Sequence, residues 1–499
     1  MFSRIYSRAD LGMDAPQVIV ETHISPGLPG FSLVGLPEAA VRESRERVRS
    51  AIINSGFEYP VRRITVNLAP ADMPKRGGRH DLAIAVGILA ASGQLADAKT
   101  DGIEFVAELA LSGQLRAVPG AIVAVQASQS SGRAIVLSHV NRHEAQVIRK
   151  NKAFCAQTLL EVCQAILEPD SIKGVDYCAL KPKLSSYDFD LSDVQGQKLG
   201  CRALELSAAG GHNLLFSGPP GTGKTLLAER LPGILPPLTE SAMLAVASIY
   251  SVAGVPVCQD LSPPWRAPHH SISTAALIGG GRRPHPGEIS LAHSGVLFLD
   301  EFAEFRKEAL ESLRQPLESG SVLVSRADYR SYFPAQFQLI AAMNPCPCGF
   351  WGDSQKPCGC TDRIIRRYRS KISGPLLDRF DLFVELARPS QEEWSTELAS
   401  TSSEVRGRVV EARGRCRIAA GINALATVAE LKTGLGMSSA AEGLLERATE
   451  KLRLSLRARA RTLKLARTIA DFVGAQPIDV DHIAEALSYR ATDTQRFNV

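Results

Sequence analysis

Hydrophobic and polar positions alternate in the first third of the chain in the way that half-buried β-strands require. In residues 61–68 the apolar side chains of Ile64, Val66 and Leu68 fall on one face of an extended segment, because successive side chains of a strand point to opposite sides. Other strand-like segments are residues 18–24, 31–36 and 104–111. Segments with helical patterns lie between and after them, at residues 37–55, 80–92 and 161–168. We therefore predict an α/β domain over residues 1–168.

The pattern changes in the middle of the chain to short apolar runs. Strands are predicted at residues 214–216, 296–299, 322–324 and 338–342, and the continuous run at 296–299 is of the kind that a parallel sheet buries on both faces. Residues 169–190 are rich in Pro, Lys, Ser and Asp without periodicity, which indicates a linker. Residues 386–499 show no convincing strand and predict helices, most clearly at 439–452, 458–473 and 480–489. The predicted organisation is an α/β domain, a linker, a parallel-sheet core at 191–385 and a helical domain at 386–499.

Length and composition narrow the class of protein. The chain has 499 residues, more than one hydrophobic core supports. Its 45% hydrophobic and 22% charged residues are typical of a soluble protein, and its net charge of +5 gives no global argument for a polyanionic partner. The chain shows neither a signal-peptide pattern at its start nor a run approaching about 18 apolar residues. Ten cysteines are too sparse for a disulfide scaffold. We expect a cytoplasmic protein that does not contact a membrane.

The stretch with the most specific chemistry is a glycine-rich run between an apolar segment and a predicted helix. It consists of Gly218, Pro219, Pro220, Gly221, Thr222, Gly223, Lys224 and Thr225. A strand–loop–helix context of this kind is that of a P-loop, whose glycines allow backbone N–H groups to face phosphate oxygens. In that setting Lys224 reaches the β- and γ-phosphates, and Thr225 holds Mg²⁺. The sequence therefore predicts an ATP site.

A second apolar run ends in two carboxylates. Residues 295–299 read Gly-Val-Leu-Phe-Leu and are followed by Asp300 and Glu301. At the end of a buried strand, Asp300 is placed to bind Mg²⁺ beside the phosphates, and Glu301 is the natural general base for the attacking water. A purely structural Asp-Glu pair is the alternative for the motif alone. Together with the P-loop, the motif predicts ATP hydrolysis.

Two further polar residues beside apolar segments are candidates for catalysis. Asn344 follows residues 340–343 and is placed to contact the γ-phosphate or the attacking water; the alternative is an Asn that begins a turn before Pro345. Arg379 is flanked by apolar residues and is our candidate arginine finger, acting in trans on the ATP of a neighbouring subunit. The alternative for Arg379 is a surface ion pair with Asp378 or Asp381.

Four cysteines lie close together in the sequence. They are Cys346, Cys348, Cys358 and Cys360, and glycines and Pro357 supply tight turns between them. Four thiolates complete a tetrahedral structural zinc site, although the C-x-C spacing is less specific than C-x₂-C, and free thiols in a loop are the alternative. Arginines follow this segment at residues 363–369, and further basic clusters lie at 406–417 and 453–464; a solvated helix face is their alternative.

Taken in order, these motifs resemble the ComM/YifB family of magnesium-chelatase-like AAA+ ATPases. The resemblance rests on GHNLL at 211–215, RAPHH at 266–270, ALIGGG at 276–281, PGEISLAH at 286–293, NPCPCG at 344–349, ISGPLLDR at 372–379 and ARTIAD at 466–471. It implies an AAA+ core of the helix-2-insert clade and a ring, usually a hexamer, with ATP between subunits. It also implies that Arg457 is a second sensor that touches the γ-phosphate in cis, with Arg461 as the alternative.

The N-terminal region resembles the Lon protease domain, which has the ribosomal S5 domain 2-like fold. Lon-type peptidases use a Ser nucleophile and a Lys base. The corresponding segments here, PKRGGRHDLA at 74–83 and LRAVPGAI at 115–122, lack the Ser and the Lys respectively. We therefore interpret this domain as non-proteolytic and expect it to bind DNA, a partner protein or a neighbouring subunit.

The resemblance to ComM proteins implies a ring-forming DNA translocase or helicase that promotes branch migration during natural transformation. Two segments are predicted to form pore loops that contact branched or single-stranded DNA, namely residues 279–287 and the hairpin 321–334. Their candidate phosphate and base contacts are Arg282, Arg283, Arg326, Tyr329 and Arg330; loops that only shape the ring interior are the alternative. A chelatase-type motor that remodels a partner protein is the second hypothesis, and an ATP-dependent protease is the third.

Overall fold

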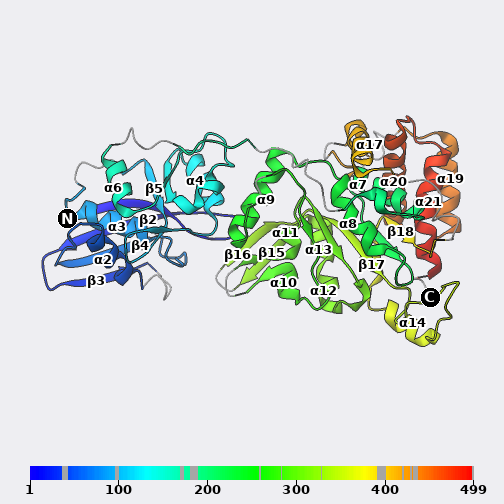
Figure 1. The fold of residues 1–499 in the computed structure, drawn as a ribbon, viewed down its shortest axis with the longest axis horizontal. Coiled ribbons are helices and arrows are strands. Elements are labelled where there is room, and N and C mark those ends of the chain that lie inside the picture. The colour runs from blue at the N-terminus through cyan, green and yellow to red at the C-terminus, as the bar shows by residue number, and fades with distance from the viewer. Residues whose placement is uncertain are drawn as a thin grey trace.

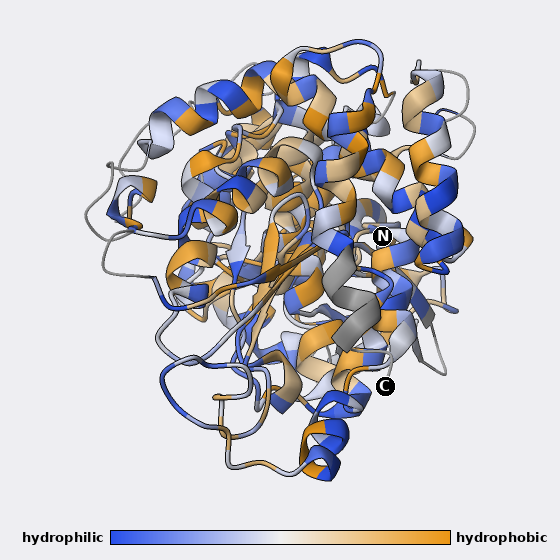
Figure 2. Cartoon of the chain, turned by 90° about the vertical axis from the view of Figure 1, so that its right-hand side faces the viewer, coloured by the Kyte–Doolittle hydropathy of each residue, from blue (hydrophilic) through white to orange (hydrophobic). Residues whose placement is uncertain are grey.

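Three parts follow one another along an elongated molecule (Figure 1), with the N-terminal domain at one end and the C-terminal helices at the other. The computed structural model describes residues 1–35, 43–95, 100–168, 174–179, 189–257, 260–281, 284–326, 329–389, 400–418, 421–427, 430 and 436–496. Figure 2, which looks along the long axis, shows orange hydrophobic segments gathered inside and blue segments on the outer faces of the helices.

The N-terminal domain contains a seven-stranded mixed sheet with the order β3-β4-β2-β1-β5-β8-β9. Its strands are β1 (Phe2–Arg8), β2 (Gln17–Ser25), β3 (Gly30–Val34), β4 (Arg63–Ala69), β5 (Ile103–Val106), β8 (Ala134–Ser138) and β9 (Ala153–Ala156). Strand β2 is antiparallel to β1 and β4, and the other neighbours are parallel. The remaining elements are α2 (Ser44–Asn54), α3 (Asp81–Ala91), β6 (Glu108–Leu109), β7 (Leu115–Arg116), α4 (Ala121–Ser130), α5 (Arg142–Ala145) and α6 (Leu159–Leu167).

Tertiary contacts modify several of the predicted elements in this domain. The predicted strand at 104–111 is divided into β5 and β6, because the N–H of Ala107 donates to the carbonyl of Arg79 instead of continuing a ladder. Helix α3 is buried on nearly every side between the sheet and α2, as its apolar sequence predicts. Strands β1, β8 and β9 and helix α4 were not predicted.

The central domain contains a five-stranded parallel sheet with the order β11-β14-β17-β10-β18. Its strands are β10 (Leu214–Ser217), β11 (Trp265–Arg266), β14 (Val296–Leu299), β17 (Gln338–Met343) and β18 (Leu382–Glu385). In the register, Leu214 of β10 lies opposite Ile340 of β17 and Leu382 of β18. The helices of this domain are α7 (Lys198–Gly210), α8 (Lys224–Ile234), α9 (Glu240–Ala253), α10 (Thr274–Ile278), α11 (Glu288–Leu291), α12 (Lys307–Ser312), α13 (Arg314–Ser319), α14 (Asp362–Arg369) and α15 (Gly374–Leu377).

Two small antiparallel hairpins extend from this sheet domain. One pairs β12 (Gly279–Gly280) with β13 (His285–Pro286), and the other pairs β15 (Ser321–Arg326) with β16 (Tyr329–Pro334). The predicted hairpin at 321–334 is confirmed, with Ser321 opposite Pro334. The strand at 322–324 therefore lies outside the central sheet.

The C-terminal helices pack against the central domain beside α7 and α8. They are α17 (Ser402–Arg415), α19 (Ser439–Lys451), α20 (Leu456–Val473) and α21 (Val480–Arg496). One hydrophobic cluster joins Leu204 of α7, Leu227 of α8, Val409 of α17 and Leu465 of α20. A single packed core therefore joins α8 to these helices.

The N-terminal domain contacts the central domain mainly through α9. The carbonyl of Ser251, near the end of α9, accepts a hydrogen bond of 2.9 Å from the N–H of Gly120, where α4 begins. The Ser251 hydroxyl also donates to the Glu144 carboxylate, and Arg149 forms an ion pair of 2.6 Å with Glu240 at the start of α9. The buried contacts make α9 the mechanical link between the two domains.

The α/β class, the parallel-sheet core and the helical C-terminal region are as predicted. In the part of the chain that the structure describes, no helix combines the length and apolarity that a membrane crossing requires.

Candidate functional site

The glycine-rich run forms an open loop between β10 and α8. Gly221 and Gly223 have φ angles of 80° and 85°, and no atom lies within 4 Å of where a Cβ would be at either position. This concave space is what a phosphate group needs to approach the backbone. At Gly218, by contrast, a Cβ would lie 2.3 Å from the carbonyl oxygen of Leu386, so packing at that position excludes any side chain.

Lys224 is held inside this loop by two backbone carbonyls. Its ammonium group donates to the carbonyls of Gly218 and Pro219 at 2.7 and 2.8 Å. Burial lowers the pKa of Lys224 to about 8, and nearby Asp300 opposes part of that change. An anionic phosphate would restore the favourable environment that the buried ammonium lacks.

The oxygens expected to hold Mg²⁺ lie together. The hydroxyl of Thr225, in the first turn of α8, donates to Oδ2 of Asp300 at 2.7 Å. Asp300 directly follows β14. Oδ1 of Asp300 accepts the backbone N–H of Glu301 at 2.8 Å. A hydroxyl and a carboxylate beside a phosphate loop are the hard oxygen ligands that Mg²⁺ prefers. The donor set therefore fits the predicted Mg²⁺ site.

Glu301 has a partner that the sequence reasoning did not identify. Its Oε2 lies 2.9 Å from Nδ1 of His270, while its backbone is in the left-handed region with φ of 52°. The His270 ring also contacts the ring of His269, at a tilt of 35° and with centroids 4.0 Å apart. In the sequence, residues 266–270 stand out only as part of a family motif. The signal that could have found the pair is the position of residues 267–270 directly after β11, which is the neighbour of β14.

Asn344 lies at the same edge of the sheet. It follows β17, whose last residue, Met343, accepts a hydrogen bond of 3.3 Å from the N–H of Gly218. Strand β17 lies between β14 and β10, so Asn344 emerges between the carboxylates and the P-loop. The carboxyl ends of parallel strands are where ligands bind in open α/β sheets.

Arg379 lies at the opposite end of the strands, where β10 and β18 begin. Its carbonyl accepts the side-chain amide of Asn213 at 2.9 Å, and Asn213 directly precedes β10. Gly218 lies five residue steps along the chain from Asn213, about 17 Å in extended backbone. The Arg379 guanidinium instead pairs with Glu318 of α13 at 2.9 Å. Arg379 is therefore remote from the P-loop of its own chain.

The four cysteine sulfurs converge on one point, and we call residues 346–360 the four-cysteine module. All four ligand atoms lie within 4.8 Å of one another, and the three measured pairs are 3.3, 3.5 and 3.7 Å apart. Sulfurs bound tetrahedrally to zinc at about 2.3 Å lie about 3.8 Å apart. The donor set and spacing thus fit a zinc ion.

The four-cysteine module touches the ATP site and is fastened to the core. A Cβ at Gly349 would lie 2.8 Å from Cδ of Pro220 in the P-loop. On the other side Arg369 stacks over Trp351 at 4.3 Å and donates to the carbonyl of Pro345. A change in the conformation of the module would therefore displace Pro220 and with it the P-loop.

Comparison with known proteins gives matches along nearly the whole chain. Family models match three regions: "Magnesium chelatase, subunit ChlI" at residues 190–394, "Subunit ChlI of Mg-chelatase" at 20–141, and "Magnesium chelatase, subunit ChlI C-terminal" at 399–490. Competence protein ComM of Haemophilus influenzae is 47% identical over 502 residues, covering 98% of this chain and 97% of that protein. The chain belongs to the ComM/YifB family of magnesium-chelatase-like AAA+ ATPases.

Two further relatives show how far along the chain this similarity extends. Uncharacterized protein YifB of Escherichia coli K12 is 46% identical over 501 residues, covering 98% of this chain and 97% of that protein. A magnesium-chelatase 67 kDa subunit of Chlorobaculum parvum is 28% identical over 179 residues, or 35% of this chain and 25% of that protein. The similarity to this chelatase subunit is thus confined to part of each chain, whereas the similarity to ComM and YifB extends over nearly the whole of both chains.

Within this ComM/YifB-family chain, Arg457 lies with Arg379 rather than with the P-loop. Its guanidinium is 3.7 Å from Glu318, the carboxylate that also pairs with Arg379. Arg461 pairs with Asp381 at 2.6 Å and donates to the carbonyl of Arg379. Both candidate second sensors thus have their partners around Arg379 and Asp381, and the cis contact with the γ-phosphate stays a prediction that these contacts do not favour.

The buried carboxylate of Asp381 organises this arginine cluster. Burial alone would raise its pKa, but Arg461 and His212 hold the pKa of Asp381 well below its usual range. His212 contacts it at 3.3 Å and also bonds to the Thr468 hydroxyl of α20 at 2.7 Å. The ionised carboxylate thereby ties the start of β18 to the C-terminal helices.

The residues predicted to contact DNA lie in two places. Arg282 and Arg283 lie outside the described residues. The backbones of Arg326 and Tyr329 are paired in the register of the β15–β16 hairpin, and Arg330 beside them is exposed. The structure adds a candidate in α14, where Arg363, Arg366 and Arg367 are exposed and have no acidic partner among the described residues. We call these three the α14 triplet.

Proposed function

We propose that this protein is an ATP-driven, ring-forming DNA translocase that promotes branch migration during natural transformation. The observation that carries the proposal is the separation of the ATP machinery into two parts on opposite edges of one sheet. Lys224, Thr225 and Asp300 occupy one edge, and Arg379 occupies the other. A complete site then requires two subunits, which is the geometry of a ring.

Hydrolysis assigns a distinct task to each residue of the first edge. The backbone of residues 218–225 and the Lys224 ammonium bind the ATP phosphates, and Thr225 and Asp300 would hold Mg²⁺, which neutralises phosphate charge when bound. Glu301 accepts a proton from the water that attacks the γ-phosphate, while His270 orients its carboxylate. Asn344 positions that water. The products are ADP and inorganic phosphate.

The neighbouring subunit supplies the second part of the site. Arg379 exchanges its contact with Glu318 for the developing negative charge on the γ-phosphate. Arg457 shares Glu318 and lies on the same face, so we assign it to the same interface in trans. ATP binding and subunit contact are thereby coupled, as a hexameric motor requires.

The choice of DNA as the track rests on the family and on surface charge. The relative from Haemophilus influenzae carries the name competence protein. Arg330 and the α14 triplet place exposed guanidinium groups on segments that project from the sheet domain, and in Figure 2 the helix at the lower end is largely blue. Phosphate contacts of this type bind DNA without reading its sequence.

We assign a structural zinc ion to Cys346, Cys348, Cys358 and Cys360. The thiolates would hold it, and the ion supplies cross-linking between the ends of a loop that has little hydrophobic core of its own. Because Gly349 lies against Pro220, this cross-link supports the P-loop as well as the base of α14.

The test compares ATP turnover in the presence of forked DNA, single-stranded DNA and unfolded protein, together with the movement of a labelled three-strand junction. We expect forked DNA to stimulate turnover and the junction to be resolved only with ATP. Lys224→Ala should abolish nucleotide binding, and Glu301→Gln should retain binding and lose turnover. Stimulation by unfolded protein and not by DNA would overturn the proposal in favour of the second candidate.

That second candidate is a chelatase-type motor that remodels a partner protein. It is favoured by the three family models, all of which describe a magnesium chelatase subunit. The N-terminal domain, held on α9 through Ser251, would then be the element that moves the partner.

A further inference from the structure

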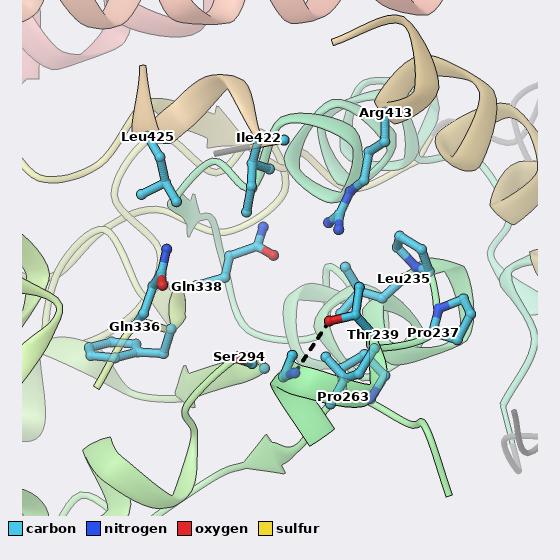
Figure 3. Close-up of a pocket in the computed structure, with 17 residues that line it drawn as sticks. Leu235, Pro237, Thr239, Pro263, Ser294, Gln336, Gln338, Arg413, Ile422 and Leu425 are labelled. Atoms are coloured by element: carbon cyan, nitrogen blue, oxygen red, sulfur yellow. Dashed lines mark hydrogen bonds between the residues drawn. The ribbon is translucent and has the colours of Figure 1, made fainter. Parts of the chain in front are cut away.

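A pocket of about 400 Å³ lies between the sheet domain and the C-terminal helices, at the end of the sheet opposite to the P-loop. Its walls come from the chain after α8, from the starts of β14 and β17, and from α17 and the loop that follows it (Figure 3). The apolar part of the lining includes Leu235, Pro237, Pro263, Phe337, Ile422 and Leu425. This volume suits a small organic molecule.

The polar part of the lining has an unbalanced charge. Of the described lining residues only Arg413 is charged, and it has no carboxylate partner within the described chain. Its Nε and Nη2 donate to the carbonyl of Ala208 at 3.2 and 2.7 Å, whereas Nη1 has no described partner. Burial lowers the pKa of Arg413 to about 10, so the side chain still carries its charge at neutral pH.

An acceptor lies beside this donor. Nε2 of Gln338 donates to Ser207 and to the carbonyl of His212 at 2.6 to 2.9 Å, which leaves its amide oxygen without a partner in the described chain. In Figure 3 the Arg413 guanidinium and the Gln338 amide point toward one another at one side of the pocket. A ligand there meets a cation, an amide oxygen and proline-rich apolar walls.

We propose that this pocket binds a small organic anion with an apolar or aromatic body. A half-buried guanidinium without a counterion is unfavourable, and an anionic group on the ligand would supply the missing charge at Arg413. The apolar body would fill the space between the prolines and two residues of the segment after α17, Ile422 and Leu425. The absence of any acidic side chain from the described lining selects against cations.

The position of the pocket gives such a ligand access to the ATP site. Helix α8 begins at Lys224 in the P-loop and ends at Ile234, directly before the lining residues Leu235 and Pro236. Its 11 residues span about 16 Å as a rigid rod. The opposite wall belongs to α17 and the segment after it, so a bound molecule joins the sheet domain to the C-terminal helices. A ligand that fixes this junction should slow every step that needs these helices to move against the sheet domain.

The test uses two fluorescent probes that differ in one group. 8-Anilinonaphthalene-1-sulfonate carries the anion, and N-phenyl-1-naphthylamine has the same aromatic body without it. We expect one sulfonate site per chain and about tenfold weaker sulfonate binding in Arg413→Gln, the size of one lost charge-assisted hydrogen bond. Binding of the neutral probe should change less than twofold. An equal effect on both probes, or none, would overturn the proposal.

Two further variants guard against a merely structural effect. Leu425→Trp fills the pocket and retains Arg413, so it should abolish binding of both probes without lowering Tm. Arg408→Gln is the matched control, because Arg408 lies on the same helix but pairs with Glu205 at the surface, and it should bind both probes like the parent. Retained binding in Leu425→Trp would place the probe elsewhere and refute the assignment.

The measurements are made on the full chain, both as an assembled ring and as a dilute subunit. Binding that is present in the dilute subunit but lost in the ring would overturn the proposal and assign the pocket to a neighbouring copy. At saturation the sulfonate probe should reduce ATP turnover in the parent at least threefold and leave Leu425→Trp unaffected. Unchanged turnover of the parent would refute the coupling through α8.

Discussion

The contact between His270 and Glu301 makes a quantitative prediction about the catalytic base. Glu301 is held in the left-handed region, with φ of 52°, which costs about 1–2 kcal/mol for a residue with a side chain. Its carboxylate is 55% exposed, so the 2.9 Å contact to His270 is worth only about 1 kcal/mol. Without it the carboxylate samples rotamers that cannot reach the attacking water.

His270→Ala should therefore lower kcat about fivefold, the equivalent of about 1 kcal/mol, and leave KM for ATP unchanged, because the P-loop contacts persist. His270→Asn should retain most of the activity, since its amide can still donate to the carboxylate. His139→Ala, at an exposed position of the N-terminal domain, is the control for loss of an imidazole elsewhere.

The assay is steady-state ATP turnover of assembled rings, with nucleotide affinity measured separately. A fall of more than 100-fold in His270→Ala would mean that the imidazole itself accepts the proton, and unchanged kcat would mean that it does not orient the base. In the Glu301→Gln background, removal of His270 should have no further effect on turnover. An additive loss would refute the proposed dependence of one residue on the other.

Four other outcomes test the remaining assignments. Arg379→Ala rings should assemble but be inactive, and mixing them with Glu301→Gln subunits should restore turnover at the interfaces that keep both groups; no recovery in intact mixed rings contradicts the trans placement. Elemental analysis should find one zinc per chain, and chelation should lower both Tm and ATP turnover, whereas metal-free active protein would exclude the structural zinc. Burial lowers the pKa of the Lys224 ammonium to about 8, and a bound phosphate should raise it again. ATP binding above pH 8 should therefore take up protons, and the Kd for ATP should rise by up to about tenfold per pH unit. Calorimetry in buffers of different ionisation enthalpy measures this uptake, and its absence would contradict the assignment. Replacing the α14 triplet by Gln should reduce the slope of log affinity for duplex DNA against log salt by about 2–3 at unchanged basal turnover, and an unchanged slope would remove α14 from the DNA interface.

Much of the ATP site could be predicted because its parts are local in sequence. The buried strands before Gly218, Asp300 and Asn344 are continuous apolar runs, and parallel pairing brings their ends to one edge without further information. The four-cysteine module was also local, since all its sulfurs come from residues 346–360.

The remaining features depend on contacts between distant segments. His270 follows a strand of only two residues, β11, which gives no periodic signal, and its pairing with Glu301 appears only once β11 lies beside β14. Arg457 meets Glu318 through an exposed contact between distant segments, and a motif alone carries no information on such a contact. The Arg413 pocket draws on segments far apart in the chain and has no sequence signature.

Glu318 neutralises two arginines within a single subunit. By pairing with both Arg379 and Arg457, this half-exposed carboxylate acts as a resident counterion on the face that meets the next subunit. In the ring proposed above, an incoming phosphate would displace this carboxylate, so a subunit without nucleotide next to it would keep its arginines occupied. Ring closure would then be an exchange of anions: the free energy of docking would depend on whether the neighbour presents ATP, ADP or an empty loop, and the proposed motor would sense the occupancy of the next site through one acidic side chain.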